Sequence, residues 1–126
     1  MIGTVHYSYF IGNSIHDTYN RAMTFHGVHY LRAEYNVAYK TMGHVFFIED
    51  GIETKNYIYK NLAMHSSRSF SLLNTDTTPA SFWITNQDNI FIGNHAAGAD
   101  RYGYWFDSRP NPTGPSADPN ICPDHG

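Results

Sequence analysis

A fourfold repeat centred on asparagine runs through most of the chain and limits the folds it can adopt. A short, mostly β-prone run precedes the asparagine in each copy, at Asn13, Asn36, Asn61 and Asn94. A second run begins nine residues after the asparagine in three copies, and eleven extra residues displace it in the third. Without the extra residues the period is 22–25 residues. Such a period, with short β runs and no helical periodicity, predicts a parallel β-helix.

We therefore expect an all-β, right-handed parallel β-helix of about four coils, a fragment of a longer β-helix. Residues 1–112 form the coils, with an insertion at about 66–79 in the third coil, and residues 113–126 form a Pro-rich tail. Equivalent residues of adjacent coils stack at the strand spacing, so the repeated asparagines predict a ladder of side-chain amide hydrogen bonds. The alternative is four unrelated asparagines in turns.

Composition excludes several classes of function. The 126 residues suffice for one domain, 41% are hydrophobic and 16% are aromatic. A net charge of −3 removes the cationic surface that non-specific nucleic-acid binding needs, so we expect no nucleic-acid partner. No apolar run approaches the roughly 20 residues of a membrane span, so we expect no membrane insertion in this segment. We expect no signal peptide and no cofactor, since the first residues lack a basic start and an apolar stretch, and the sequence contains no Gly-rich phosphate loop or nucleophile elbow.

Side-chain alternation along the second run separates a core face from an outward face. The second and fourth positions predict the core: Met23 and Phe25, Phe46 and Ile48, Phe82 and Ile84, Tyr104 and Phe106. The third position aligns Thr24, Phe47, Trp83 and Trp105, and the fifth aligns His26, Glu49, Thr85 and Asp107. An aromatic column beside an acidic one predicts a surface for a long polysaccharide. In the alternative, the insertion or the tail folds over these rings and buries them.

The eight histidines raise the question of a metal site. His16, His26 and His44 lie in consecutive coils, with Glu49 and Asp50 nearby, and such a set can hold zinc or another divalent ion. However, the H-E-x-x-H and H-x-H signatures are absent. We expect hydrogen-bonded or surface histidines and no metal, with the divalent site as the alternative.

Two acids of the outward face allow a catalytic alternative. Glu49 and Asp107 lie two coils apart, so roughly 9.6 Å separates their Cβ atoms at the strand spacing. That distance is at the upper edge of the roughly 6.5–9.5 Å window of inverting glycosidases. A polysaccharide depolymerase or lyase is therefore the alternative function.

Several segments resemble a known family. They are Arg21-Ala-Met-Thr-Phe-His26-Gly27, Gly43-His44-Val-Phe-Phe-Ile-Glu49-Asp50-Gly51, Thr78-Pro-Ala-Ser-Phe-Trp-Ile-Thr-Asn86 and Asn120-Ile-Cys-Pro123. Together they resemble the parallel β-helix region of the fibrocystin-L family and, more distantly, that of the cell-migration-inducing and transmembrane hyaluronidases. The resemblance covers roughly residues 5–124.

The resemblance implies an extracellular or cell-surface location and a partner for Cys122 outside this segment. The fibrocystin-L branch implies a non-catalytic module of a cell-surface, ciliary or filament-forming glycoprotein. The outward column adds glycan contact at Phe47, Trp83, Trp105 and Asp107 to this expectation. The open strand edges of a β-helix fragment predict end-on stacking of copies or continuation by more chain.

The hyaluronidase branch implies cleavage of hyaluronan. The matching positions are His26, His44, Glu49 and Asp50, with Arg21 as a clamp for a sugar carboxylate. The third-coil insertion is shorter here than in that branch, and these 126 residues do not include the glycine-rich domain that precedes the β-helix in the family. Both departures argue against catalysis, so the non-catalytic function is preferred.

Overall fold

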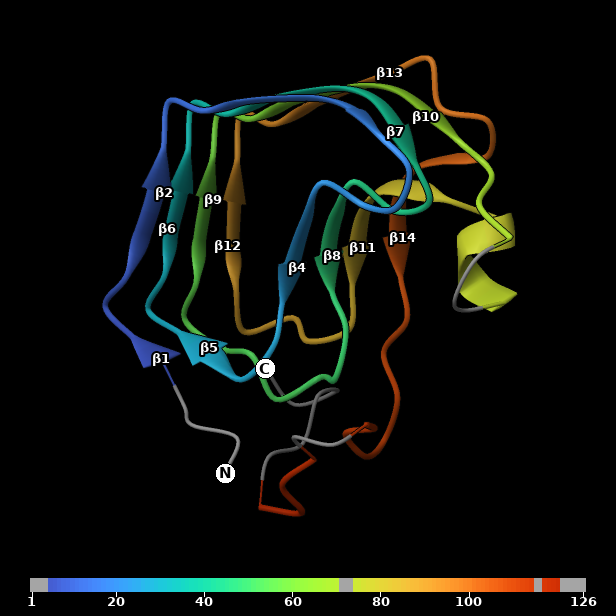
Figure 1. The fold of residues 1–126 in the computed structure, drawn as a ribbon. Coiled ribbons are helices and arrows are strands. Elements are labelled where there is room, and N and C mark those ends of the chain that lie inside the picture. The colour runs from blue at the N-terminus through green and yellow to red at the C-terminus, as the bar shows by residue number, and fades with distance from the viewer. Residues whose placement is uncertain (1–4, 71–73, 115–116, 121–126) are drawn as a thin grey trace.

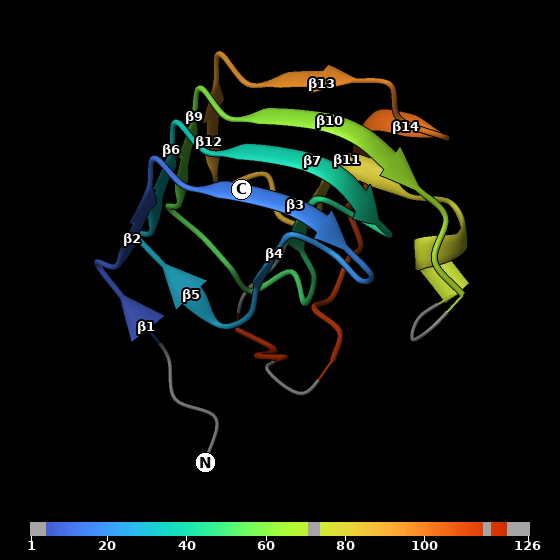
Figure 2. The same ribbon diagram turned by 45° about the horizontal axis from the view of Figure 1, so that its top comes forward.

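The chain winds as a right-handed parallel coil of about four turns (Figures 1 and 2). The structure is a computed structural model that describes residues 5–70, 74–114 and 117–120. Each strand pairs in parallel with the equivalent strand of a neighbouring coil, as in β8, which lies between β4 and β11. The predicted all-β parallel solenoid is confirmed.

The strands of the described residues form three four-stranded sheets and one two-stranded sheet. The first four-stranded sheet contains β2 (Tyr9–Ile11), β6 (Arg32–Glu34), β9 (Tyr57–Tyr59) and β12 (Ile90–Ile92). The second contains β3 (Ser14–Thr18), β7 (Val37–Met42), β10 (Leu62–Ser67) and β13 (His95–Ala97). The third contains β4 (Met23–Phe25), β8 (Phe46–Ile48), β11 (Ala80–Ile84) and β14 (Tyr102–Phe106). In addition, β1 (Val5–His6) pairs with β5 (Val28–His29), and the 3-10 turn η1 (Asn74–Thr77) lies in the third-coil insertion.

The asparagine ladder connects the coils where the first sheet passes into the second. The side-chain amide of each asparagine donates to Oδ1 of the next at 2.9–3.0 Å, along the series Asn13, Asn36, Asn61 and Asn94. The residue before each asparagine has a positive φ: Gly12, Tyr35, Lys60 and Gly93. A left-handed residue bends the chain sharply, and the ladder satisfies the polar groups that this bend buries. The predicted ladder is confirmed.

A second, shorter asparagine column was not predicted. Oδ1 of Asn56 accepts the backbone amide of Leu31 at 2.9 Å, and Oδ1 of Asn89 accepts the amide of Asn56 at 3.0 Å. Both asparagines directly precede the first run of their coil, where the earlier coils have Ser8 and Leu31. These hydrogen bonds join the bends before the first sheet in the second, third and fourth coils.

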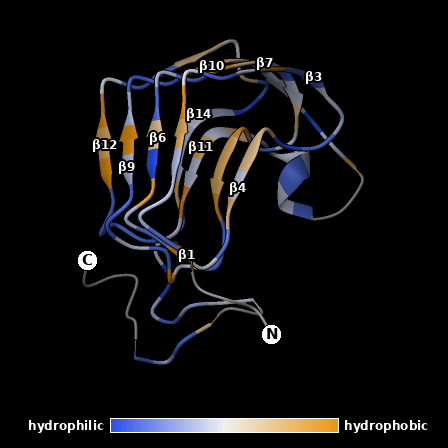
Figure 3. Cartoon of the chain, turned by 60° about the vertical axis from the view of Figure 1, so that its left-hand side comes forward, coloured by the Kyte–Doolittle hydropathy of each residue, from blue (hydrophilic) through white to orange (hydrophobic). Residues whose placement is uncertain are grey.

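The core fills the interior of the coil. Phe46 and Phe82 stack with their ring centroids 5.0 Å apart, and Ala38 and Ala63 are fully buried between the sheets. The predicted core face holds for the first three coils, with Phe25 buried and Met23 packed against the core, but Tyr104 and Phe106 of the last coil are 41% and 60% exposed. No described strand pairs with the outer edge of β14, so no further coil covers the Tyr104 and Phe106 rings on that side. Hydropathy is uneven between strands, since β12 is hydrophobic whereas β6 is hydrophilic (Figure 3).

Candidate functional site

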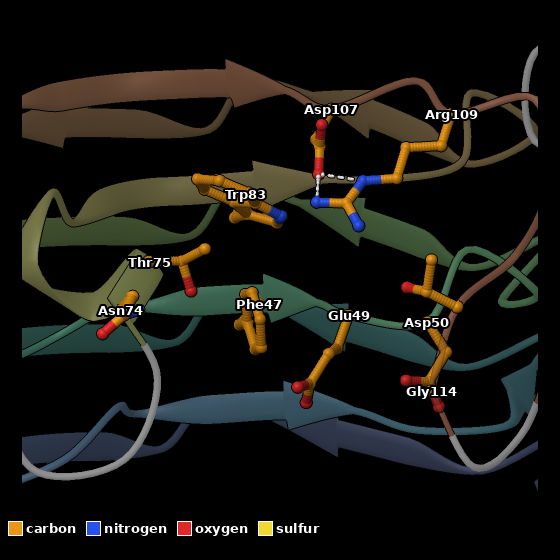
Figure 4. A pocket seen from close by; sticks show the side chains of 10 residues that line it. Phe47, Glu49, Asp50, Asn74, Thr75, Trp83, Asp107, Arg109 and Gly114 are labelled. Carbon is orange, nitrogen blue, oxygen red and sulfur yellow. Dashed lines mark hydrogen bonds and ion pairs between the residues drawn. The ribbon is translucent and has the colours of Figure 1, made fainter.

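A pocket of about 290 Å³ opens on the outer side of the third sheet. It lies over β8 and β11, between η1 on one side and the segment after β14 on the other (Figure 4). The residues that line it are Phe47, Glu49, Asp50, Asn74, Thr75, Trp83, Asp107, Arg109, Thr113 and Gly114. Three carboxylates, two aromatic rings and one guanidinium therefore surround one cavity.

Arg21 forms one end of the polar network beside this pocket. Its Nη2 and Nε donate to the two carboxylate oxygens of Asp76 at 2.9 and 3.3 Å, and its Nη1 lies 3.5 Å from Oε2 of Glu49. Its Cζ lies 4.2 Å from the ring centroid of Phe47, a cation–π distance. Because Asp76 belongs to η1, this pair also fixes the insertion against the third sheet.

His26 lies between two carboxylates. Its Nε2 is 2.8 Å from Oε2 of Glu49, and its Nδ1 is 3.3 Å from Oδ2 of Asp50. The parallel register of β4 and β8 pairs Phe25 with Ile48, so the residues that follow each strand lie side by side. Adjacent coils therefore bring this imidazole and these two acids together, as the sequence predicted for Glu49 and Asp50.

Glu49 is partly buried in this network. Burial raises the pKa of its carboxyl, while the charges of His26 and Arg21 oppose that rise. A partly buried acid that contacts an imidazole and faces a cavity can accept hydroxyl hydrogen bonds, exchange a proton or ligate a cation.

Glu53 positions the backbone around the His26 cluster. Its carboxylate is fully buried and accepts the amide of Gly27 at 2.9 Å through Oε1 and the amide of Gly51 at 3.0 Å through Oε2. Those glycines directly follow His26 and Asp50. Burial raises the pKa of Glu53, and the amide hydrogen bonds act against that rise. One buried side chain thus connects the two loops that carry the cluster.

The structure separates the three histidines that were considered together as metal ligands. His16 lies on β3, where its Nδ1 is 2.9 Å from Asp17 on the exposed surface. His44 is fully buried, and its Nε2 faces Oδ1 of Asp76 at 3.8 Å, beyond hydrogen-bond distance. Of these histidines only His26 contacts the Glu49 and Asp50 carboxylates.

His44 belongs to the packing behind the pocket. Its Nδ1 accepts the backbone amide of Ala80 at 3.1 Å, and its ring lies 4.7 Å from that of Phe47 and 4.5 Å from that of Trp83. Desolvation by burial lowers the pKa of His44 to about 4, although Asp76 acts to raise it. The ring is therefore neutral near pH 7 and does not reach the pocket.

The residues of the outward aromatic column pair in the predicted register, but two of its three rings are buried rather than exposed. Phe47 pairs with Trp83, and Trp83 with Trp105, whose ring centroids are 5.8 Å apart. Phe47 is only 2% exposed and Trp83 7%, whereas Trp105 is 36% exposed. Arg21, which is hydrogen-bonded to Asp76 of the insertion, covers Phe47. For this part of the column, the alternative that the insertion buries the rings is therefore correct. Phe47 and Trp83 still line the pocket, whereas Trp105 does not.

Asp107 and the segment that follows it close the other side of the pocket. The Asp107 carboxylate pairs with Arg109, with Nη2 at 2.7 Å and Nε at 2.9 Å (Figure 4). The amide of Thr113 donates to the backbone oxygen of Asp50 at 2.8 Å. The chain after β14 therefore returns across the coil to the His26 cluster.

Sequence reasoning missed several residues of the site. Asp76 and Glu53 lie outside the repeat positions, so alignment of the coils did not select them. Arg109 and Thr113 follow the last strand, where no further copy fixes a register. The sequence offered one indication of these residues, because charged side chains are frequent directly after the second run of a coil.

Comparison with known proteins agrees with the family resemblance. A family model described as the CEMIP β-helix matches residues 1–125. Fibrocystin-L of Mus musculus is 50% identical over 115 residues, which cover 91% of this chain and 3% of that protein. The chain therefore spans only a small part of this relative. The predicted resemblance to the fibrocystin-L family is confirmed.

Two hyaluronan-related proteins also match. The cell surface hyaluronidase CEMIP2 of Homo sapiens is 34% identical over 140 residues, 91% of this chain and 10% of that protein. The cell migration-inducing and hyaluronan-binding protein of Homo sapiens is 32% identical over 127 residues, 82% of this chain and 9% of that protein. In the part of this chain that the structure describes, no helix has the length and apolar character needed to cross a membrane.

Proposed function

The chain is a member of the CEMIP β-helix family, and we propose that it is a non-catalytic, glycan-binding module of an extracellular or cell-surface protein. The relatives named as a cell surface hyaluronidase and as a hyaluronan-binding protein support this location and this class of ligand. The observation that carries the proposal is the pocket, in which Trp83 lies beside the Asp107–Arg109 pair.

The chemistry of the pocket suits a saccharide. Carboxylates such as Glu49 and Asp107 accept hydrogen bonds from sugar hydroxyls, and Arg109 can pair with a sugar carboxylate. The Trp83 ring, which lines the pocket, can pack against the apolar C–H face of a sugar. A volume of about 290 Å³ is near the lower end of the roughly 300–1,000 Å³ range of ligand pockets, so a short part of a chain enters it.

Binding of hyaluronan oligosaccharides, measured by saturation-transfer NMR and calorimetry, tests the proposal. We expect Arg109→Ala and Asp107→Asn to weaken binding by about tenfold, or about 1.4 kcal/mol. Arg32→Ala is the matched control, because Arg32 is also exposed and pairs with an acid, Glu34, on the first sheet. Absence of binding by the unaltered chain, or equal loss in Arg32→Ala, contradicts the proposal.

Trp105→Ala distinguishes a pocket from an extended groove. A ligand confined to the pocket does not contact Trp105, so its affinity stays unchanged in that variant. A polysaccharide lying along the whole predicted column loses affinity, because Trp105 is the most exposed member of that column. Either outcome keeps glycan binding and assigns its surface.

A polysaccharide depolymerase is the second candidate function. The observation that favours it is that two acids, Glu49 and Asp107, line one pocket, and that His26 contacts Glu49 at 2.8 Å. In this function Glu49 exchanges a proton with the substrate, His26 and Asp50 assist it, and buried His44 acts only through packing. If hyaluronan keeps its chain length over time with the unaltered chain, this candidate fails. If it shortens, we expect Glu49→Gln to stop the reaction and Asp17→Asn to leave it unchanged.

Self-association is a separate proposal. The last coil presents exposed apolar residues along its edge, including Ile90, Ile92 and Phe106. Exposed strand edges template pairing with further strands, as filament formation requires. Sedimentation velocity at increasing concentration tests it, and a monomer at every concentration contradicts it. The ciliary role rests on the fibrocystin-L resemblance alone.

A further inference from the structure

We propose that His26, Glu49 and Asp50 bind one divalent cation of the zinc or manganese class. The described residues contain one group of histidine, cysteine and acidic side chains close enough to ligate an ion together, and it is this one. The cation site goes beyond glycan binding and is independent of it, because the metal alone is expected to bind.

The distances between the donor atoms suit a shared ion. An imidazole ligates an ion through one nitrogen, and Nε2 of His26 is 2.8 Å from Oε2 of Glu49. With one ligand atom counted from each of His26, Glu49 and Asp50, the three atoms lie within 4.8 Å of one another. Ligands bound to zinc at roughly 2.0–2.2 Å lie roughly 3–4 Å from one another. Small side-chain rotations therefore bring three donors onto one ion, without movement of the strands that carry them.

The local charge also matches a dication. Arg109 pairs with Asp107 at 2.7 Å, whereas Arg21 pairs with Asp76 at 2.9 Å and also lies 3.5 Å from Oε2 of Glu49. The Glu49 and Asp50 carboxylates carry a formal charge of −2, and Arg21, which is shared with Asp76, offsets it only in part. Asp50 is only 2% exposed, and a carboxylate removed from water requires compensation by a cation or by hydrogen bonds.

The cluster is held in place before any ion arrives. Buried Glu53 bonds the amides of Gly27 and Gly51, which follow His26 and Asp50. The backbone oxygen of Asp50 also accepts the amide of Thr113. Such preorganisation lowers the entropy lost when the ligands converge.

The ligand set indicates both the class of ion and its remaining coordination. Imidazole favours zinc and related transition metals, whereas carboxylates also accept manganese. Three protein ligands leave at least one position for water or an external oxygen ligand. Since Glu49 and Asp50 line the pocket, that position faces the cavity.

Titration of the chelator-treated chain with the metals alone tests the proposal. We expect one equivalent of Zn²⁺ to bind by calorimetry and one equivalent of Mn²⁺ by loss of the free-ion EPR signal. His26→Gln and Glu49→Gln are expected to weaken binding by about tenfold or more. Their side chains are 46% and 22% exposed, so both variants are expected to fold, which thermal unfolding checks.

His16→Ala is the matched control, because His16 also contacts an aspartate at 2.9 Å but lies on the second sheet. Its affinity for both metals is expected to equal that of the unaltered chain. The proposal is overturned if no saturable one-to-one binding occurs, or if His26→Gln and Glu49→Gln bind as tightly as the control. Because no saccharide is present, such a failure leaves glycan binding untouched.

Discussion

Arg21 and Asp76 lie 55 residues apart and form a two-point ion pair that holds the third-coil insertion against the third sheet. The Asp76 side chain is fully buried, and its Oδ1 also accepts the amide of His44 at 3.2 Å. The pair places the guanidinium over the Phe47 ring. One contact between distant segments therefore covers an aromatic residue that the strand pattern directs outward.

Asp76→Ala is expected to destabilise the fold by about 3 kcal/mol, because it leaves a largely buried guanidinium without its partner. Urea unfolding followed by fluorescence measures this loss. Asp100→Ala is the control, since Asp100 accepts a single exposed amide hydrogen bond from Arg68. A loss in Asp76→Ala no larger than in the control contradicts a central role for this pair.

Glu53→Gln is expected to loosen the two loops of the His26 cluster. The amide replaces one acceptor oxygen by a donor, so one buried backbone N–H loses its partner, at a cost of about 1–3 kcal/mol. Hydrogen exchange measures the effect directly, and the Gly27 or Gly51 amide is expected to exchange faster. The Gly12 amide, bonded to the Glu34 backbone oxygen at 2.9 Å, is the internal control. Unchanged exchange at both glycines contradicts the prediction.

His44 predicts a pH-dependent stability. Its folded-state pKa of about 4 lies below the ordinary value of 6.5, so the unfolded chain binds the proton more tightly. The stabilisation is complete above pH 6.5 and is lost as the pH falls toward 4, by about 3 kcal/mol. The groups that face the ring are Asp76, Arg21, Phe47 and Trp83.

Unfolding free energies between pH 4 and pH 7 measure this dependence. His44→Asn keeps an acceptor for the Ala80 amide but cannot titrate, so its stability is expected to vary less over the same range. Other acids act equally in both proteins, and the difference between the two slopes isolates His44. Parallel curves for the two proteins contradict the prediction.

Asn61→Ala is expected to destabilise the chain by about 2–4 kcal/mol, because Asn61 is fully buried and bonds both neighbouring coils. Its loss also leaves the Ala33 oxygen without the 2.8 Å hydrogen bond from Nδ2. Asn13→Ala is the control at the first position of the ladder, where only one neighbouring coil is bonded. Thermal unfolding compares the two, and an equal loss contradicts a cooperative ladder.

Much of the fold was predictable because repetition transfers information between coils. The asparagine ladder and the pairing of Phe47 with Trp83 and Trp105 follow from the period alone. The placement of His26 beside Glu49 follows as well, since each directly follows one of two paired strands. The predicted burial of Tyr104 and Phe106 was wrong. They share the core pattern, but among the described residues no further coil packs against theirs.

The coil, its register and the set of side chains directed away from the core could be read from the order of the residues, because strand alternation and a regular period are local properties of the chain. Which of those side chains remain accessible depends on contacts between segments far apart in the chain. Asp76 and Thr113 come from segments outside the repeat, and their contacts with Arg21 and Asp50 convert an outward face into a pocket. Contacts between irregular segments do not repeat from coil to coil, so aligning the coils cannot predict them.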